Sequence, residues 1–424
     1  MHDRSAASTE AARPTGRSGG LRVLVLAFGV FAVGTDEFVL AGLLPRLGSS
    51  MDISIATAGQ VVTAFGLTCA LLTPVLATLT TGWRRRPVLL GSLLVYLVGN
   101  VATALAPSFE LLLIAQIVAA AGTGLFVPTA AVTASSMVEP ERRGRVLAIV
   151  TTGFTTATAL GAPIGTALGG QFGWRATIWF VAALAVLGLV GVLAVIPRTI
   201  AAAADGAGAA PDSLRDRIAP LADRRVLPLL ATTLAAFGGL YIPYTYIAAV
   251  FEPATHGSAD ALAALLLAFG LTGTVANLCG GFLVDRFGGR KVVTAALTLL
   301  TVCMLVLPLA TGSLAIALPM VVIWSVAAWT ITAPQQYRLI TLRPESAAVL
   351  VSLNAAIIYL AISLSGVLGA VGMGWVGAGR LGLIAAVLTA AAIVLSELGH
   401  RAARRHTAPA AAGAAAEPAP AEQG

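Results

Sequence analysis

The sequence predicts an all-α membrane protein that crosses the bilayer twelve times. Hydrophobic residues make up 58% of the 424 residues and charged residues only 11%, whereas soluble domains hold roughly 45–50% apolar and about 25% charged residues. The apolar residues are also gathered into runs of about 20, the length that a helix needs to cross a hydrocarbon core roughly 30 Å thick. A soluble globular protein is therefore excluded.

The chain opens with a polar segment, residues 1–22, which we expect to be a disordered cytoplasmic tail. The first apolar run, Val23–Leu44, is too long for the hydrophobic region of a signal peptide and ends in no cleavage site of small residues. We therefore expect this run to be the first membrane span.

Eleven further apolar runs follow, separated by short polar or Gly/Pro breaks. The longest break, residues 197–226, is charged and rich in Ala and Gly, and we expect a cytoplasmic loop that divides the chain into halves at 23–196 and 227–398. Residues 399–424 are expected to form a disordered cytoplasmic tail. The predicted spans are Val23–Leu44, Thr57–Leu79, Val88–Leu105, Leu111–Met137, Val146–Gly170, Thr177–Ile196, Leu227–Phe251, Ala261–Val284, Val292–Leu309, Leu314–Ala333, Ala347–Met373 and Leu381–Leu398.

The positive charges orient these spans. If both termini are cytoplasmic, 23 of the 26 Lys and Arg residues lie on the cytoplasmic side. The positive-inside rule therefore predicts this orientation in the cytoplasmic (inner) membrane. The net charge of +7 then follows from topology, and no nucleic-acid partner is expected.

The loop between the second and third spans of the second half reads GFLVDRFGGRK. An acid at the end of a helix, followed by cations five and six residues later, can make charge contacts with a neighbouring helix. The pattern resembles the G-x-L-x-D-R-x-G-R-K loop motif of the major facilitator superfamily. The resemblance implies that Asp285, Arg286, Arg290 and Lys291 form a cytoplasmic gate, whereas the equivalent loop of the first half lacks the acid.

Twelve spans, split six and six around a charged loop, match that family over nearly the whole chain. The resemblance implies two pseudo-symmetric six-helix halves around one central cavity that opens alternately to each side of the membrane. It implies a secondary active transporter, so we expect a small-molecule substrate and protons as partners, a monomer in the lipid bilayer, and no cofactor.

The fifth span combines proline and glycine at Gly161, Pro163, Gly165 and Gly169. Proline bends a helix and glycines provide a flat face for a neighbouring helix. The run is similar to the fifth-span motif of the superfamily's antiporters, in particular the twelve-span drug:proton antiporters. A kinked packing helix without a transport role is the alternative.

Two adjacent acids, Asp36 and Glu37, lie inside the first span. A charged side chain near the bilayer centre costs about 2.5–3.5 kcal/mol on insertion scales, so such residues are functional candidates. Neighbouring positions differ by about 100° around a helix, so at most one acid can point squarely into a central cavity. The run GTDEF with the following LLP resembles the first span of bacterial drug and sugar efflux members, including the chloramphenicol-resistance branch.

These acids have no evident cationic partner within the membrane. Gln116 occupies the position at which the family's fourth-span motif carries an arginine, and no Lys or Arg lies deep in a predicted span. Two unpaired carboxylates in a medium of low dielectric constant favour protonation of one of them for part of the cycle. We therefore expect Asp36, Glu37 and Gln116 to serve proton coupling or substrate contact.

Polar and aromatic side chains inside other spans are candidates for lining the cavity. Three tyrosines gather around Pro243 in the seventh span, and we expect them to form a stacking surface with one tryptophan of the tenth. An interhelical hydrogen bond or an interfacial anchor is the alternative for each residue. The candidates are Tyr241, Tyr244, Tyr246, Asn277, Trp324 and Asn354.

The function expected is export of a small, largely hydrophobic compound, a drug or antibiotic, in exchange for protons. Efflux of a sugar or another polar metabolite is the alternative within transport, and a transporter-like sensor that binds without turnover is the alternative outside it. An enzyme is not expected, because the four His residues lie in tails or a loop and the sequence contains no metal-ligand spacing or nucleophile motif.

Overall fold

The computed structural model describes residues 16–80, 82–139, 142–198 and 223–414. These residues are almost entirely helical, and they contain 12 helical segments long and apolar enough to cross a membrane, which confirms the predicted fold class. In chain order the elements are α1 (Gly16–Met51), α2 (Ile55–Ala58), α3 (Gln60–Leu79), α4 (Arg85–Leu105), α5 (Phe109–Ser136), α6 (Arg143–Thr156), the π-helix η2 (Ala157–Gly161), α7 (Ala162–Phe172), α8 (Trp174–Val195), α10 (Val226–Thr245), α11 (Ile247–Val250), α12 (Glu252–Thr255), α13 (Ala259–Phe287), α14 (Gly289–Val306), η4 (Leu307–Leu309), α15 (Leu314–Trp329), α16 (Thr332–Leu342), η5 (Pro344–Ser346), α17 (Ala347–Val376), η6 (Ala378–Arg380) and α18 (Leu381–Ala414).

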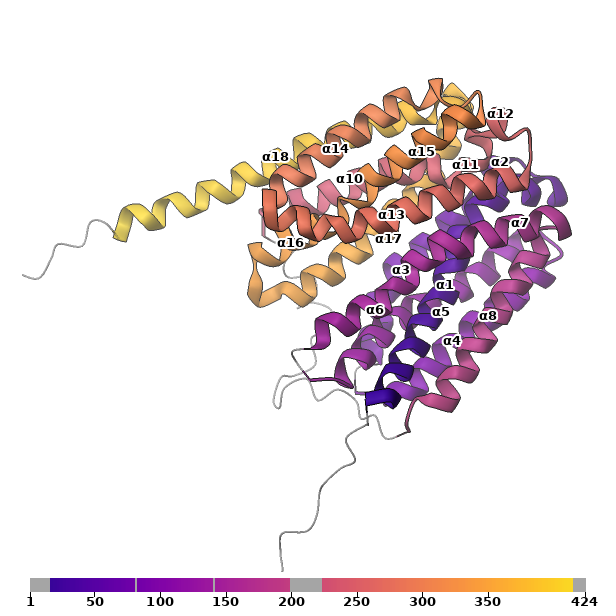
Figure 1. Ribbon diagram of the computed structural model, residues 1–424, viewed down its shortest axis with the longest axis horizontal. Coiled ribbons are helices and arrows are strands. Elements are labelled where there is room, and N and C mark those ends of the chain that lie inside the picture. Colours follow the sequence, from indigo (N-terminus) through magenta and orange to yellow (C-terminus); the bar gives the residue numbers. More distant parts are fainter. Residues whose placement is uncertain (1–15, 81, 140–141, 199–222, 415–424) are drawn as a thin grey trace, which may run out of the picture.

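The helices are arranged as two halves, α1 to α8 and α10 to α18 (Figure 1). Because the number of spans is even, α1 begins and α18 ends at the same end of the bundle, which we call the termini end. Figure 1 shows the two halves side by side at the opposite, far end, where α2, α11 and α12 lie. Toward the termini end, where α6 and α16 lie, the two sets of ribbons diverge.

Small residues hold the two halves close together at the far end. An added Cβ at Gly59 would clash with the Tyr246 ring of the other half, and one at Gly170 would clash with Ala259. Glycine and alanine allow helices to approach closely where lipid provides no hydrophobic drive for their association. The close contact between the halves therefore requires small residues at these positions, because a larger side chain would push the helices apart.

Several helix ends differ from the predicted ones. The seventh predicted span, Leu227–Phe251, is divided, because α10 ends at Thr245 and α11 follows. The last helix, α18, continues to Ala414, so residues 399–414 are helical in a region where the sequence predicts a disordered tail. Ala and Arg are strong helix formers, so a helix can extend past the apolar run. Residues 1–15, 199–222 and 415–424 lie outside the described residues, and with them most of the predicted N-terminal tail and central loop and the last part of the predicted C-terminal tail.

Candidate functional site

The two acids of α1 face different surroundings. Asp36 is fully buried inside the N-terminal half, where Asn100 Nδ2 of α4 donates a hydrogen bond to Asp36 Oδ2 at 3.3 Å. Glu37 is half-buried and faces the other half, where the Tyr359 hydroxyl of α17 donates to Glu37 Oε2 at 3.4 Å. The angle of about 100° between neighbouring helical positions thus directs one carboxylate into a half and the other to the boundary between the halves.

Asp36 lies in a small polar pocket that contains more hydrogen-bond acceptors than donors. Gln116 is fully buried beside Asp36 and donates from Nε2 to the Thr103 hydroxyl at 3.3 Å. Three buried oxygens, Asp36 Oδ1, Asn100 Oδ1 and Gln116 Oε1, have no hydrogen-bond partner among the described residues. Leaving buried acceptors unpaired is costly. A proton on Asp36 would provide a donor for one of them.

Neither acid forms an ion pair with a cation of the described residues. The four ion pairs found in the described part of the chain involve Asp223, Glu345 and Glu397, and none includes Asp36 or Glu37. A buried carboxylate without a cation is expensive to keep charged. The pocket is therefore suited chemically to exchange a proton or to receive a cationic group.

An aromatic cluster joins the two halves next to Glu37. The Phe38 ring lies 6.2 Å from the Tyr244 ring in a T-shaped contact, and the Phe269 ring lies 5.0 Å from Tyr244 and 5.1 Å from Trp324. The hydroxyl of Tyr244 and the indole nitrogens of Trp324 and Trp329 have no hydrogen-bond partner among the described residues. We define the aromatic cluster as Phe38, Phe154, Phe237, Tyr241, Tyr244, Phe269, Trp324 and Trp329.

The remaining predicted cavity residues lie elsewhere. The Tyr246 hydroxyl donates to the Gly366 carbonyl at 2.7 Å near the far end. Asn354 accepts a hydrogen bond from Thr233 at 2.8 Å, and Gln335 donates to the same threonine. Both hydrogen bonds connect helices of the C-terminal half, and a role of Tyr246 and Asn354 in lining the cavity stays a prediction. Asn277 is half-buried on α13.

Sequence reasoning missed the phenylalanines of the cluster. Phe269 has no polar atom, so nothing distinguishes it from an ordinary apolar residue of a membrane span. Phe38 had a signal, since it directly follows Asp36 and Glu37. Its ring contacts Phe154 of its own half and Trp329 of the other half.

The glycines of the fifth span pack against α1. Added Cβ atoms at Gly161, Gly165 and Gly169 would clash with Thr35, Val39 and Leu43, respectively, which are spaced four residues apart on α1. The helix forms the π turn η2 just before Pro163, which has no N–H to donate. The motif therefore brings an irregular turn against the residue that precedes Asp36.

Among the predicted gate residues, Arg290 pairs with an acid of a different helix. Asp285 is exposed and forms no ion pair with another described residue. Arg290 instead pairs with Glu397 of α18, with Nη2 to Oε2 at 2.5 Å and Nε to Oε1 at 3.2 Å. The expected contact with a neighbouring helix is therefore made by Arg290, and its partner comes from the last span.

Comparison with known proteins identifies the family. Residues 26–366 match the model of the Major Facilitator Superfamily. The chain is 30% identical to the uncharacterised MFS-type transporter YbcL of Bacillus subtilis over 89% of this chain and 96% of that protein. It is 32% identical to the inner membrane transport protein YdhP of Escherichia coli K12 (85% and 90% covered) and 34% identical to a chloramphenicol resistance protein of Streptomyces lividans (66% and 71% covered).

Solved structures show the same fold. A bacterial homologue of the human lysosomal transporter Spinster, in an inward-facing and unoccupied conformation, matches with a TM-score of 0.76 at 18% identity, over 92% of this chain and 98% of that chain. A mutant form of the nucleoside transporter NupG matches with a TM-score of 0.69 at 13% identity, over 90% and 99%. The chain is a multi-pass membrane transporter that belongs to the major facilitator superfamily.

Proposed function

We propose that this transporter exports a small, largely hydrophobic compound across the cytoplasmic membrane in exchange for protons, as a monomer with both termini in the cytoplasm. The observation that carries the proposal is Asp36, a fully buried carboxylate that has an unpaired oxygen and no cationic partner among the described residues. Its neighbour Glu37 faces the boundary between the halves. A proton on one acid can thus be coupled to an event at that boundary.

The two acids have different roles in the proposed exchange. Asp36 holds a proton in the N-terminal half, with Asn100 and Gln116 as polar neighbours. Glu37 contacts the substrate or a second proton where the halves meet. Inward movement of each positive charge releases about 2.3 kcal/mol per 100 mV of membrane potential, which drives export of the compound.

The aromatic cluster supports a ring-containing, lipophilic substrate. Its members come from both halves, so a compound stacked there would contact both. The 34% identity to a chloramphenicol resistance protein points toward the same substrate class. The unpaired Tyr244 hydroxyl and indole nitrogens favour a substrate with hydrogen-bond acceptors, and for this reason efflux of a polar metabolite is the second candidate.

Everted membrane vesicles test the coupling. A pH-sensitive dye reports proton movement when compounds are added to vesicles that hold a proton gradient. We expect substrate-induced proton release from wild type and from Glu110→Gln, an exposed acid that serves as the matched control. We expect the release to be lost in Asp36→Asn or Glu37→Gln.

Each result separates the candidates. Release that is unchanged in both variants would remove Asp36 and Glu37 from the coupling mechanism. Release with sugars but not with lipophilic antibiotics would favour the polar metabolite. Binding of compounds without any release or transport would favour a sensor.

A further inference from the structure

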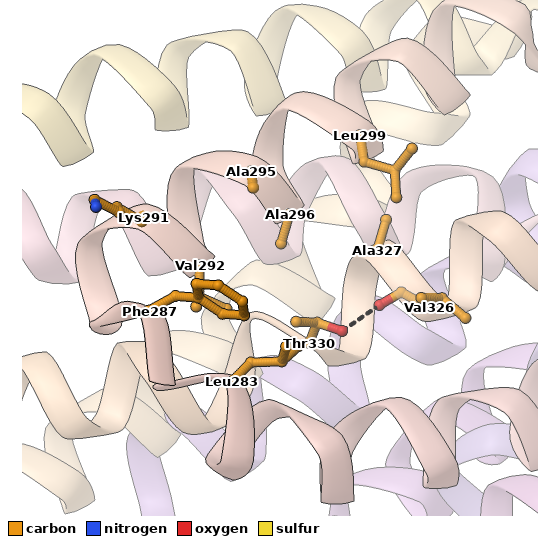
Figure 2. A pocket seen from close by; sticks show the side chains of 10 residues that line it. All are labelled: Leu283, Phe287, Lys291, Val292, Ala295, Ala296, Leu299, Val326, Ala327 and Thr330. Atoms are coloured by element: carbon orange, nitrogen blue, oxygen red, sulfur yellow. Dashed lines mark hydrogen bonds between the residues drawn. The ribbon is translucent and has the colours of Figure 1, made fainter. Parts of the chain in front are cut away.

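A groove lies on the surface of the C-terminal half, between α13, α14 and α15 (Figure 2). Its volume is about 410 Å³, and its walls are apolar, with Phe287 near one end and Leu299 at the other. All of its lining residues belong to the C-terminal half. We call it the α13–α15 groove, and it is distinct from the aromatic cluster between the halves.

The groove is placed to face lipid. Its walls are parts of membrane spans, and Leu299 and Val326 are 40% and 39% exposed. Apolar side chains on the outside of such spans face the hydrocarbon core. From Lys291 to Leu299 the helix rises about 12 Å, at roughly 1.5 Å per residue. The groove therefore extends from the termini end of α14 into the span, as the first part of an acyl chain would.

A cation without a partner lies at the end where a lipid headgroup would sit. Lys291 is exposed and lines the groove, and no hydrogen bond or ion pair joins it to another described residue. A second cation, the Arg286 guanidinium, lies 5.6 Å from the ring centroid of Phe287. The exposed acid Asp285 lies on the same turn, so Lys291 and Arg286 leave a net positive charge there. The N-terminus of α14 adds a partial positive charge.

Two other polar groups near the groove already have partners. Arg290, next to Lys291, is held by Glu397. Thr330, the polar residue in the wall, donates its hydroxyl to the Val326 carbonyl (Figure 2). Lys291 is therefore the polar group of the groove that is free to bind a ligand, and the rest of the surface is suited to a hydrocarbon chain.

We propose that the α13–α15 groove binds an anionic phospholipid, with an acyl chain along α14 and the phosphate on Lys291. The lysine ammonium attracts the negatively charged headgroup, and the apolar walls bury part of the chain. The groove includes neither the two buried acids nor the aromatic cluster, so lipid binding there does not require the exchange proposed above.

Native mass spectrometry of the full chain tests the proposal with two lipids of identical chains, dioleoyl-phosphatidylglycerol and dioleoyl-phosphatidylcholine. We expect tighter binding of phosphatidylglycerol. Lys291→Gln should weaken the binding of phosphatidylglycerol about five-fold, because one cation near an anionic surface contributes about 1 kcal/mol and this energy corresponds to that ratio. Lys291→Arg should retain it, and Ala295→Trp, which fills the groove at an exposed position, should weaken binding of both lipids.

The chain offers matched controls. A second apolar groove of about 310 Å³ lies between α4 and α5 without a charged lining residue, and Ala102→Trp fills it in the same way. Arg84→Gln removes an exposed cation at the termini end of the other half. Thermal unfolding shows that each variant is folded. The proposal is overturned if Lys291→Gln leaves the preference for phosphatidylglycerol unchanged, or if Ala295→Trp has no larger effect than Ala102→Trp.

Discussion

Gly270 of α13 controls how closely the two halves approach at the middle of the membrane. It packs against the π turn η2, where an added Cβ would lie 2.5 Å from the Ala159 backbone nitrogen, whereas ordinary contact begins near 3.4 Å. Gly270→Ala therefore forces α13 about 1 Å away from η2, and overpacking of this kind costs about 1–3 kcal/mol. Because this contact joins the halves, Gly270→Ala destabilises the conformation that is closed at the far end. We expect the equilibrium between this closed conformation and one that is open at the far end to shift about 5- to 150-fold toward the open conformation.

Thiol accessibility measures this shift. Ala248→Cys, in a background where the native cysteines are serine, places a reporter in the cavity of about 230 Å³ between the halves at the far end. A membrane-impermeant maleimide added to intact cells should react faster when Gly270→Ala is present. Gly281→Ala on the same helix is the matched control, since an added Cβ there meets no atom within 4 Å. Equal rates in the two variants would refute the reasoning.

Three further predictions concern stability and binding. Trp324→Ala should lower the free energy of unfolding by about 3–5 kcal/mol because the side chain is fully buried, whereas Trp375→Ala, at an 81% exposed position, should have little effect; similar thermal midpoints for both would contradict this. A double-mutant cycle on Arg290 and Glu397 should give a coupling of about 0.2–1 kcal/mol that falls with added salt, because their side chains are 48% and 26% exposed; a coupling that does not respond to salt would count against it. Phe38→Ala should weaken binding of ring-containing compounds by about 0.5–1.5 kcal/mol for each ring that the compound stacks on Phe38. The expected readout is a higher KM for transport with an unchanged number of protons released per transported molecule. A changed number of protons would instead connect Phe38 to coupling.

The number of spans could be predicted because hydrophobic length is a local property. Each span must satisfy its own backbone hydrogen bonds in lipid, so a run of about 20 apolar residues forms a helix whatever its neighbours are. Helix ends were less predictable. The turn after Thr245 and the continuation of α18 past residue 398 depend on contacts and helix propensity outside the apolar core.

The candidate site could be predicted only in part. Asp36 and Glu37 stand out in sequence because charge in a span is rare, and helical geometry already required them to face different directions. Which acid faces which half depends on the rotation of α1 against its neighbours. That rotation results from packing, including the contact of Gly161 with Thr35.

Contacts between residues far apart in the chain could not be predicted from sequence patterns. Glu397 lies 107 positions after Arg290, and no spacing rule connects them. The same is true of Phe269, which becomes part of the aromatic cluster only because α13 lies beside α10 and α15. Asn354, a predicted cavity residue, likewise accepts a hydrogen bond from Thr233, which lies 121 positions earlier in the chain.

The sequence by itself determined which segments lie in the lipid bilayer and which lie in water, because the hydrophobicity of a single helix decides whether it enters the bilayer. It also determined that two carboxylates had to be accommodated within the membrane. Only the tertiary structure decided that Asp36 lies among unpaired acceptors, that Glu37 meets the opposite half, and that Lys291 is left free beside an apolar groove. These outcomes depend on which helices touch and at what rotation, and those contacts are made between side chains far apart in the chain.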